Sequence, residues 1–220
     1  MKKIEKNKPL PCHTKLDYDE CYSKVILETF FPELFHNLEI KDKPDLIDTQ
    51  HKIGIEVTNA TSKKEREILS LSSRITYGSS CNRKRDIQRI KKLGGRYTDY
   101  GVSLPESSYS IEEIYYSLIS IFSTKVKKLN RSGYLDLPDY RLYIYFETIY
   151  IRDYIENLVY EFQKANVMQK KYSTIYLFTL DYICIIDLFS GQVRETDLKN
   201  RHWGLSERAR QLVEEGESNE

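Results

Sequence analysis

The sequence predicts a mixed α/β domain in which helices flank a central mixed β-sheet. Apolar residues at helical spacing alternate along the chain with short β-prone runs, and no internal repeat or clear linker divides the 220 residues. Such alternation favours helices packed on a sheet over a sandwich or a helical bundle. Residues 1–220 are therefore expected to form one domain, with a helical insertion or lobe at about residues 62–139.

The first expected element is a helix over residues 17–35, which Pro32 should end or kink. Residues 38–61 switch to an alternation that puts Ile53 and Ile55 on one face, as is typical of a β-hairpin. The later elements are expected to be basic helices over 62–93 broken at 78–80, a loop over 101–110, a helix over 111–129, a strand over 141–147, a helix over 151–167, strands over 174–179 and 182–188, and a polar tail.

Composition excludes several classes of protein. No stretch approaches the roughly 20 apolar residues of a membrane helix, and no apolar run follows the basic amino terminus as it would in a secretory signal. A cytoplasmic protein is therefore expected. The formal net charge is only +1, which does not by itself indicate nucleic-acid binding. The four cysteines are too scattered for a zinc or redox motif and are expected to be free thiols: Cys12, Cys21, Cys81 and Cys184.

The hairpin is the most informative segment because its register can be estimated. If its loop is centred on residues 50–51, Asp45 faces Glu56 across the ladder. Directly opposed carboxylates repel, so a cation such as Mg²⁺ or Mn²⁺, which prefers oxygen ligands, is expected between them. Gly54 should leave room for a ligand beside the pair. Asp48 points the other way and is more simply a turn former.

Residues 44–58, PDLIDTQHKIGIEVT, resemble the catalytic hairpin of the PD-(D/E)xK nuclease superfamily, which has the restriction-endonuclease-like fold. The resemblance implies that Asp45 and Glu56 bind Mg²⁺, which activates water for attack on a phosphodiester. It also implies DNA as the partner, with RNA as the alternative nucleic acid and no membrane. Many nucleases with this type of site act as homodimers.

The sequence departs from the superfamily at Thr58, which stands where the superfamily has its lysine. A threonine hydroxyl can hydrogen-bond to water or phosphate but carries no positive charge. Lys63 and Lys64 are the nearest candidates for a displaced lysine. The resemblance further implies an auxiliary acid on the first helix, and Glu20 is expected to fill that role because it lies near the apolar face of the helix.

The hairpin is followed by a basic segment. Residues 61–100 contain eleven Lys and Arg against four Asp and Glu, which gives this segment a charge of +7. Phosphate groups bind such cations largely without regard to sequence. The expected nucleic-acid-binding residues are Arg83, Lys84, Arg85, Arg89 and Lys92.

Each of these residues also has a purely structural interpretation. Asp45 and Glu56 could lie on a solvated hairpin face, Thr58 suits any strand, and charged residues on helices are commonly solvated. The leading hypothesis is a Mg²⁺-dependent endonuclease that hydrolyses DNA. The alternatives are an inactive nuclease-fold protein that binds nucleic acid or a protein partner, and a metal-dependent phosphohydrolase that acts on small nucleotides.

Overall fold

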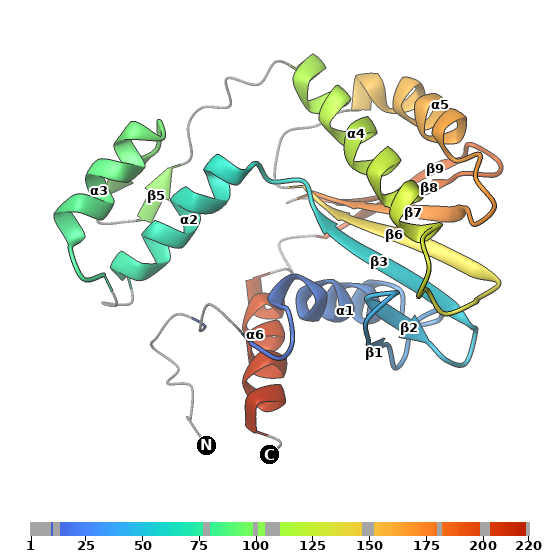
Figure 1. Cartoon of the computed structure of the whole chain (residues 1–220), viewed down its shortest axis with the longest axis horizontal. Coiled ribbons are helices and arrows are strands. Elements are labelled where there is room, and N and C mark those ends of the chain that lie inside the picture. Colours follow the sequence, from blue (N-terminus) through green and yellow to red (C-terminus); the bar gives the residue numbers. More distant parts are fainter. Residues whose placement is uncertain are drawn as a thin grey trace.

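The structure is a computed structural model that describes residues 10, 14–76, 80–98, 101–103, 111–146, 152–179, 182–198 and 203–218. Its centre is a seven-stranded sheet (Figure 1). The strands, in spatial order, are β1 (Glu39–Ile40), β2 (Leu46–Asp48), β3 (Ile53–Asn59), β6 (Asp139–Tyr145), β7 (Tyr172–Phe178), β8 (Tyr182–Asp187) and β9 (Val193–Asp197). Strand β6 pairs in parallel with β3 and β7, and the other neighbours are antiparallel, so the predicted mixed sheet is confirmed.

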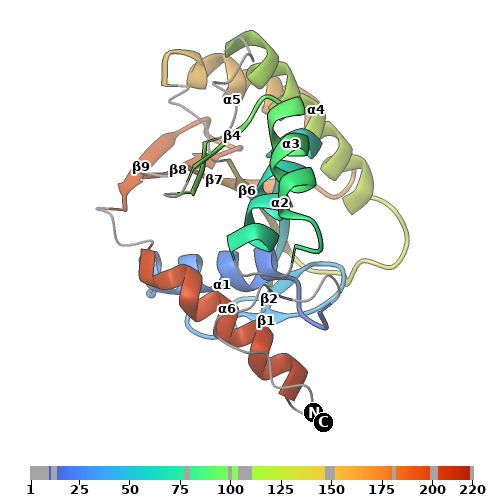
Figure 2. The same ribbon diagram turned by 90° about the vertical axis from the view of Figure 1, so that its left-hand side faces the viewer.

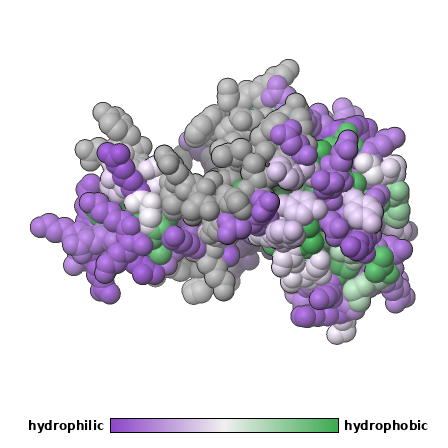
Figure 3. Space-filling model, turned by 90° about the horizontal axis from the view of Figure 1, so that it is seen from above, coloured by the Kyte–Doolittle hydropathy of each residue, from purple (hydrophilic) through white to green (hydrophobic). Residues whose placement is uncertain are grey.

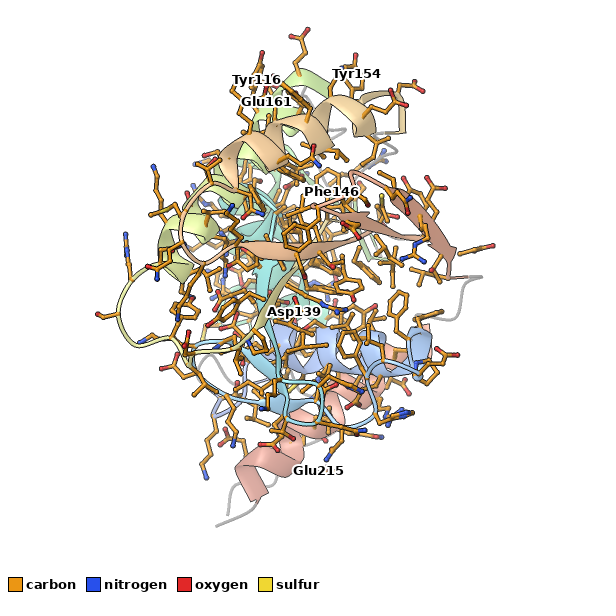
Figure 4. The ribbon with its side chains drawn as sticks, turned by 90° about the vertical axis from the view of Figure 1, so that its right-hand side faces the viewer. Tyr116, Asp139, Phe146, Tyr154, Glu161 and Glu215 are labelled. Atoms are coloured by element: carbon orange, nitrogen blue, oxygen red, sulfur yellow. The ribbon has the colours of Figure 1, made fainter. Side chains whose placement is uncertain are left out.

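Helices cover both faces of this sheet (Figure 2). They are α4 (Ile111–Leu129) and α5 (Ile155–Ala165, after the short 3-10 helix Arg152–Tyr154) on one face, and α1 (Tyr18–Phe30) and α6 (Trp203–Ser218) on the other. Under α4 and α5, Phe122 and Phe162 pack against each other with ring centroids 4.6 Å apart. Phe146 lies beneath these helices, whereas Tyr116 and Glu161 lie on their outer surface (Figure 4).

The opposite face of the sheet holds a second core, which fixes the position of α1. Asp17 caps this helix by accepting hydrogen bonds from the amides of Asp19 and Glu20. Further along, Ile26 is buried against the sheet. Val213 of α6 is fully buried in the same core, so α6 holds α1 from outside.

A small lobe is inserted between β3 and α4. It consists of α2 (Lys63–Thr76), α3 (Arg83–Lys92), β4 (Arg96–Thr98) and β5 (Gly101–Ser103). Ile68, Leu71 and Ile75 of α2 pack with Ile90 of α3 in a third, separate core. Figure 1 shows the lobe standing to one side of the sheet, joined to it through the end of β3.

Several sequence predictions can be compared directly with these elements. The helix over 111–129 is confirmed, and α1 ends at Phe30, just before Pro32. The expected loop over 101–110 is wrong at its start, because residues 101–103 form β5 against β4; residues 104–110 lie outside the described part of the chain. The expected polar tail is also wrong, because β9 and α6 follow β8 and α6 buries apolar residues.

Two further observations concern the described residues alone. None of their helices is both long and apolar enough to span a bilayer. Cys21, Cys81 and Cys184 form no disulfide among the described residues, as predicted, and Cys12 lies outside the described residues.

Candidate active site

The predicted register of the hairpin is confirmed over Leu46–Asp48, but the predicted pairing of Asp45 with Glu56 is not part of the ladder. The paired residues of β2 and β3 are Leu46 with Ile55, Ile47 with Gly54, and Asp48 with Ile53. A four-residue turn over 49–52 joins the strands. Asp48 holds this turn, as predicted, by accepting hydrogen bonds from the amides of Gln50 (2.9 Å) and His51 (3.0 Å).

On the amino-terminal side of Leu46 the backbone no longer pairs with β3, and the side chain of Asp45 hydrogen-bonds to β3 instead. The Oδ2 atom of Asp45 accepts a hydrogen bond of 2.7 Å from the backbone amide of Val57. The carboxylate therefore takes the place of a neighbouring strand at the edge of β3, directly beside Glu56. Burial and the negative charge of Glu56 both raise the pKa of Asp45, against the opposing effect of the Val57 amide.

The expected space beside Gly54 is filled by protein. A Cβ atom at Gly54 would lie 2.6 Å from Cγ of Pro44 and 2.8 Å from Cδ1 of Leu137. The prediction that a ligand approaches the backbone here is therefore wrong. Glycine is required because the ring of Pro44 packs on this strand, and that packing sets the position of Asp45.

Glu56 is almost completely buried, with 1% of its surface exposed. Its Oε1 accepts a hydrogen bond of 2.7 Å from the Tyr134 hydroxyl, and its Oε2 accepts from Nζ of Lys125 (3.0 Å) and of Lys128 (3.1 Å). Burial alone would raise the pKa of Glu56, but these donors outweigh it and lower the pKa. Glu56 is therefore a stable carboxylate in a nearly dry position.

Lys125 also bridges to the main chain of β3. Its Nζ donates to the carbonyl oxygen of Val57 at 2.7 Å, so one ammonium touches both the Glu56 carboxylate and the next residue's carbonyl. Both lysines come from α4, which crosses the face of the sheet on which Glu56 lies. Burial lowers the pKa of Lys128, but the Glu56 carboxylate outweighs burial and the pKa is raised. Two cations thus balance two carboxylates.

An open cavity of about 420 Å³ adjoins this cluster. Its wall is formed by the free edge of β3, the first turn of α1, the first turn of α2 and the last turns of α4. The lining residues used below are Glu20, Asp45, Thr58, Arg66, Lys125 and Lys128. Acids from α1 and the hairpin therefore face basic residues from α2 and α4 across one pocket.

Glu20, the predicted auxiliary acid, lies on this wall. Burial, followed by the charges of Asp45 and Asp17, raises its pKa from 4.5 to about 7. Glu28, another acid of α1, instead accepts hydrogen bonds from Lys24 and from the amide of Leu38. The structure therefore brings Glu20, Asp45 and Glu56 to one site and leaves Glu28 in a structural contact.

The other predicted residues divide between the pocket and the lobe. Thr58 lines the pocket, whereas Lys64 is exposed on α2 and is not among the lining residues. The side chain of Lys63 lies outside the described part of the structure. The five cations predicted to bind nucleic acid all lie on α3, in the lobe and away from the pocket wall: Arg83, Lys84, Arg85, Arg89 and Lys92.

Four residues of the site were not found from the sequence: Arg66, Lys125, Lys128 and Tyr134. Lys125 and Lys128 are three positions apart, so they share one face of α4, and this spacing was the available signal. Lysines are common near the carboxyl ends of helices because they interact favourably with the helix dipole. Their spacing on α4 therefore does not by itself indicate a functional site. Only the parallel pairing of β3 with β6 brings α4 over Glu56.

The donor set suits a hard divalent cation. The two carboxylates and the Val57 carbonyl are all oxygen donors, and one or two carboxylates with water and phosphate are typical ligands of Mg²⁺. Among the described residues, no group of three or more His, Cys, Asp or Glu side chains lies close enough to hold a metal ion. The Val57 carbonyl would therefore have to complete the protein's contribution.

Comparisons of the chain with protein-family models, with curated proteins and with solved structures find no match. The likeness to the PD-(D/E)xK superfamily thus stays a prediction made from residues 44–58 and their surroundings. The chain has a mixed α/β fold, and a pocket of acids and lysines lies beside the part of β3 that extends past β2.

Proposed function

We propose that this chain is a Mg²⁺-dependent nuclease of the restriction-endonuclease-like fold that hydrolyses DNA phosphodiester bonds, in the manner of an endonuclease. One observation carries the proposal. Asp45 and Glu56 lie beside the same stretch of β3, and the Lys125 ammonium contacts Glu56 and the Val57 carbonyl beside an open pocket. Acids and a carbonyl that can hold a metal ion, with an ammonium beside them, are groups that can support metal-assisted phosphodiester hydrolysis.

The acid pair and the carbonyl of Val57 would hold the ion. When bound, Mg²⁺ would polarise a phosphate oxygen and lower the pKa of a bound water. Asp45 is oriented for this role by its bond to the Val57 amide, and Glu56 by the Tyr134 hydroxyl. Burial and the bond to Glu56 raise the pKa of Tyr134, so the hydroxyl stays a donor.

Lys125 supplies the positive charge that Thr58 cannot. It reaches the acid from a neighbouring helix rather than from β3 itself, and it lines the pocket with Thr58. There its ammonium can stabilise negative charge that develops on the phosphate, while the Thr58 hydroxyl offers a hydrogen bond. Arg66 lines the same pocket with Lys125 and Lys128 and adds a third positively charged group for a phosphate.

Glu20 is the group best suited to handle a proton. With a pKa of about 7 it is substantially ionised near neutral pH, and it lies on the pocket wall. A carboxylate with a pKa near the working pH is an effective general base. We assign to Glu20 the orientation of the attacking water and the acceptance of its proton.

The proposal is tested with isosteric variants, Asp45→Asn and Glu56→Gln. Both should abolish Mg²⁺-dependent cleavage of plasmid and single-stranded DNA and weaken Mg²⁺ binding in calorimetry. Asp42→Asn, at an exposed carboxylate three residues before Asp45, is the matched control and should cleave normally. Full cleavage by both variants would refute the assignment.

One observation favours a second candidate, an inactive nuclease-fold protein that binds nucleic acid. Lys125 and Lys128 already neutralise the acid pair without a metal ion. Such a protein would bind DNA in a salt-sensitive way that depends neither on Mg²⁺ nor on Glu56. DNA binding by the Glu56→Gln variant, with no cleavage by the wild type at any Mg²⁺ or Mn²⁺ concentration, would select this candidate.

A further inference from the structure

Helix α3 carries far more positive charge than its place in the fold requires. Its ten residues, RKRDIQRIKK, include six basic residues and one acidic residue. Ile90 is buried and Ile87 packs against the lobe core. Like charges three and four positions apart on a helix repel each other, so this composition lowers the stability of the helix.

Arg89 and Arg83, two of the residues predicted to bind nucleic acid, make contacts within the lobe. Arg89 makes two hydrogen bonds, of 2.7 and 3.0 Å, to the carboxylate of Glu67 on α2. The guanidinium of Arg83 lies 5.9 Å from the ring centre of Tyr97 on β4. These contacts hold α3 against the rest of the lobe, so neither side chain is the best candidate for an outside partner.

The remaining cations form the outer surface of α3. At 100° per residue, Arg85 and Lys92 lie almost opposite the apolar face of the helix, with Lys84 and Lys91 on one flank. All four side chains are exposed, and none makes an ion pair with a described residue. Figure 3 shows a mostly hydrophilic surface over the lobe. These four residues are called the α3 track below.

The track has a defined direction relative to the pocket. The bonds of Arg89 to Glu67 and of Arg74 to Asp86 show that α3 runs antiparallel to α2. The end of α3 that carries Lys92 therefore lies beside the first turns of α2, where Arg66 lines the pocket. The end that carries Lys84 and Arg85 lies beside the last turn of α2, farther from the pocket.

We propose that the α3 track binds the phosphate backbone of duplex DNA and leads it toward the pocket. A ten-residue helix is about 15 Å long, and phosphates of one strand recur every 3.4 Å along the duplex axis, so the track spans about four of them. Proteins that bind single strands usually stack bases on aromatic side chains. The track consists of lysines and arginine with Gln88 between them, which suits backbone contacts to a duplex.

The α3 track itself requires only a duplex partner, but its role in delivering a substrate rests on the proposed nuclease activity. The test variant is the triple substitution Lys84→Gln, Arg85→Gln and Lys92→Gln. The control is a triple substitution of exposed cations outside the lobe: Lys164→Gln, Lys171→Gln and Arg208→Gln. Both sets remove three positive charges and leave the apolar cores untouched.

Binding to a 20-base-pair duplex is measured with EDTA present, so that no cleavage occurs. About 0.9 counterions are released for each phosphate contact, so the plot of log K against log salt should become shallower by about 2.7 for the track variant. The control variant should keep the wild-type slope. An unchanged slope in the track variant, or equal losses in both variants, would overturn the proposal.

The partner class and the enzymatic role are separated by two more measurements. Wild-type protein should bind the duplex more tightly than a single strand, a duplex RNA or vesicles containing phosphatidylserine, and tighter binding to any of these would overturn the choice of duplex DNA. Cleavage in Mg²⁺ is then assayed separately. A wild type that never cleaves but shows the track-dependent slope would refute the nuclease proposal and support the α3 track.

Discussion

Replacement of Lys125 by methionine should change metal binding and cleavage in opposite directions. The Lys125 ammonium contacts Glu56 Oε2 at 3.0 Å and the Val57 carbonyl at 2.7 Å, which are two of the oxygens proposed to hold Mg²⁺. A divalent cation must compete with this tethered ammonium. Methionine has a similar shape but no charge, so it removes the competitor and keeps the packing of the stem.

The expected size follows from these contacts. At an effective dielectric constant of about 20, two unit charges 3.0 Å apart attract by about 5.5 kcal/mol. The cost of desolvating both groups offsets most of this attraction, and the displaced ammonium recovers a further part when it turns toward the pocket. The net free energy with which Lys125 opposes Mg²⁺ binding is then about 1.4–2.8 kcal/mol. Because each 1.4 kcal/mol is tenfold in affinity, Lys125→Met should bind Mg²⁺ about 10 to 100 times more tightly.

Cleavage should fall in the same variant, by about 10²–10³, because a charged donor to the developing phosphate charge is lost. Calorimetry and single-turnover cleavage measure the two effects on the same samples. Lys127→Met is the control, because Lys127 is exposed on the same helix. A second substitution, Thr58→Lys, should restore part of the cleavage in Lys125→Met. Weaker or equal Mg²⁺ binding by a folded Lys125→Met protein would refute the reasoning.

Three more predictions concern neighbouring parts of the site. Glu20 has a pKa of about 7 when folded and 4.5 as its ordinary value, so the unfolded chain loses its proton first. Metal-free wild type should therefore lose stability relative to Glu20→Gln as pH rises from about 4.5 to about 7; a difference in urea unfolding that is constant with pH would contradict this. Gly54→Ala should push Pro44 and Asp45 outward, weaken Mg²⁺ binding at least about tenfold and lower the free energy of unfolding by about 1–3 kcal/mol, which calorimetry and urea unfolding would check. Val213→Asp should lower the free energy of unfolding by more than about 3 kcal/mol, because it buries a charge between α1 and α6; a urea midpoint equal to that of the wild type would show that α6 does not hold α1.

The parts of the fold that were predicted correctly depend on local pattern. The register of the hairpin follows from alternation and from the centre of one short loop, so Asp45 could be placed near the part of β3 that carries Glu56 from the sequence. The helix over 111–129 has strong apolar spacing and was also found. Both features are decided by residues that are close together in the chain.

The parts that were missed depend on distant contacts. Nothing near Lys125 in the sequence indicates that α4 crosses over Glu56, because that crossing follows from the parallel pairing of β3 with β6. The strand over 96–98 is only three residues long and follows two glycines, which mark a loop in most sequences. Helix α6 is rich in charge, and its burial of Ala209 and Val213 is visible only when it packs on α1.

The sequence separation of the residues in each contact predicts the order in which parts of the protein fold. The bond between Asp45 and Val57 spans 12 residues, and that between Arg89 and Glu67 spans 22. The bonds from Glu56 to Lys125, Lys128 and Tyr134 span 69, 72 and 78 residues. Contacts between distant residues carry the larger loop-closure entropy and form late. The hairpin and the lobe should therefore assemble first during refolding, and the acid pair should gain its lysines in one of the last steps.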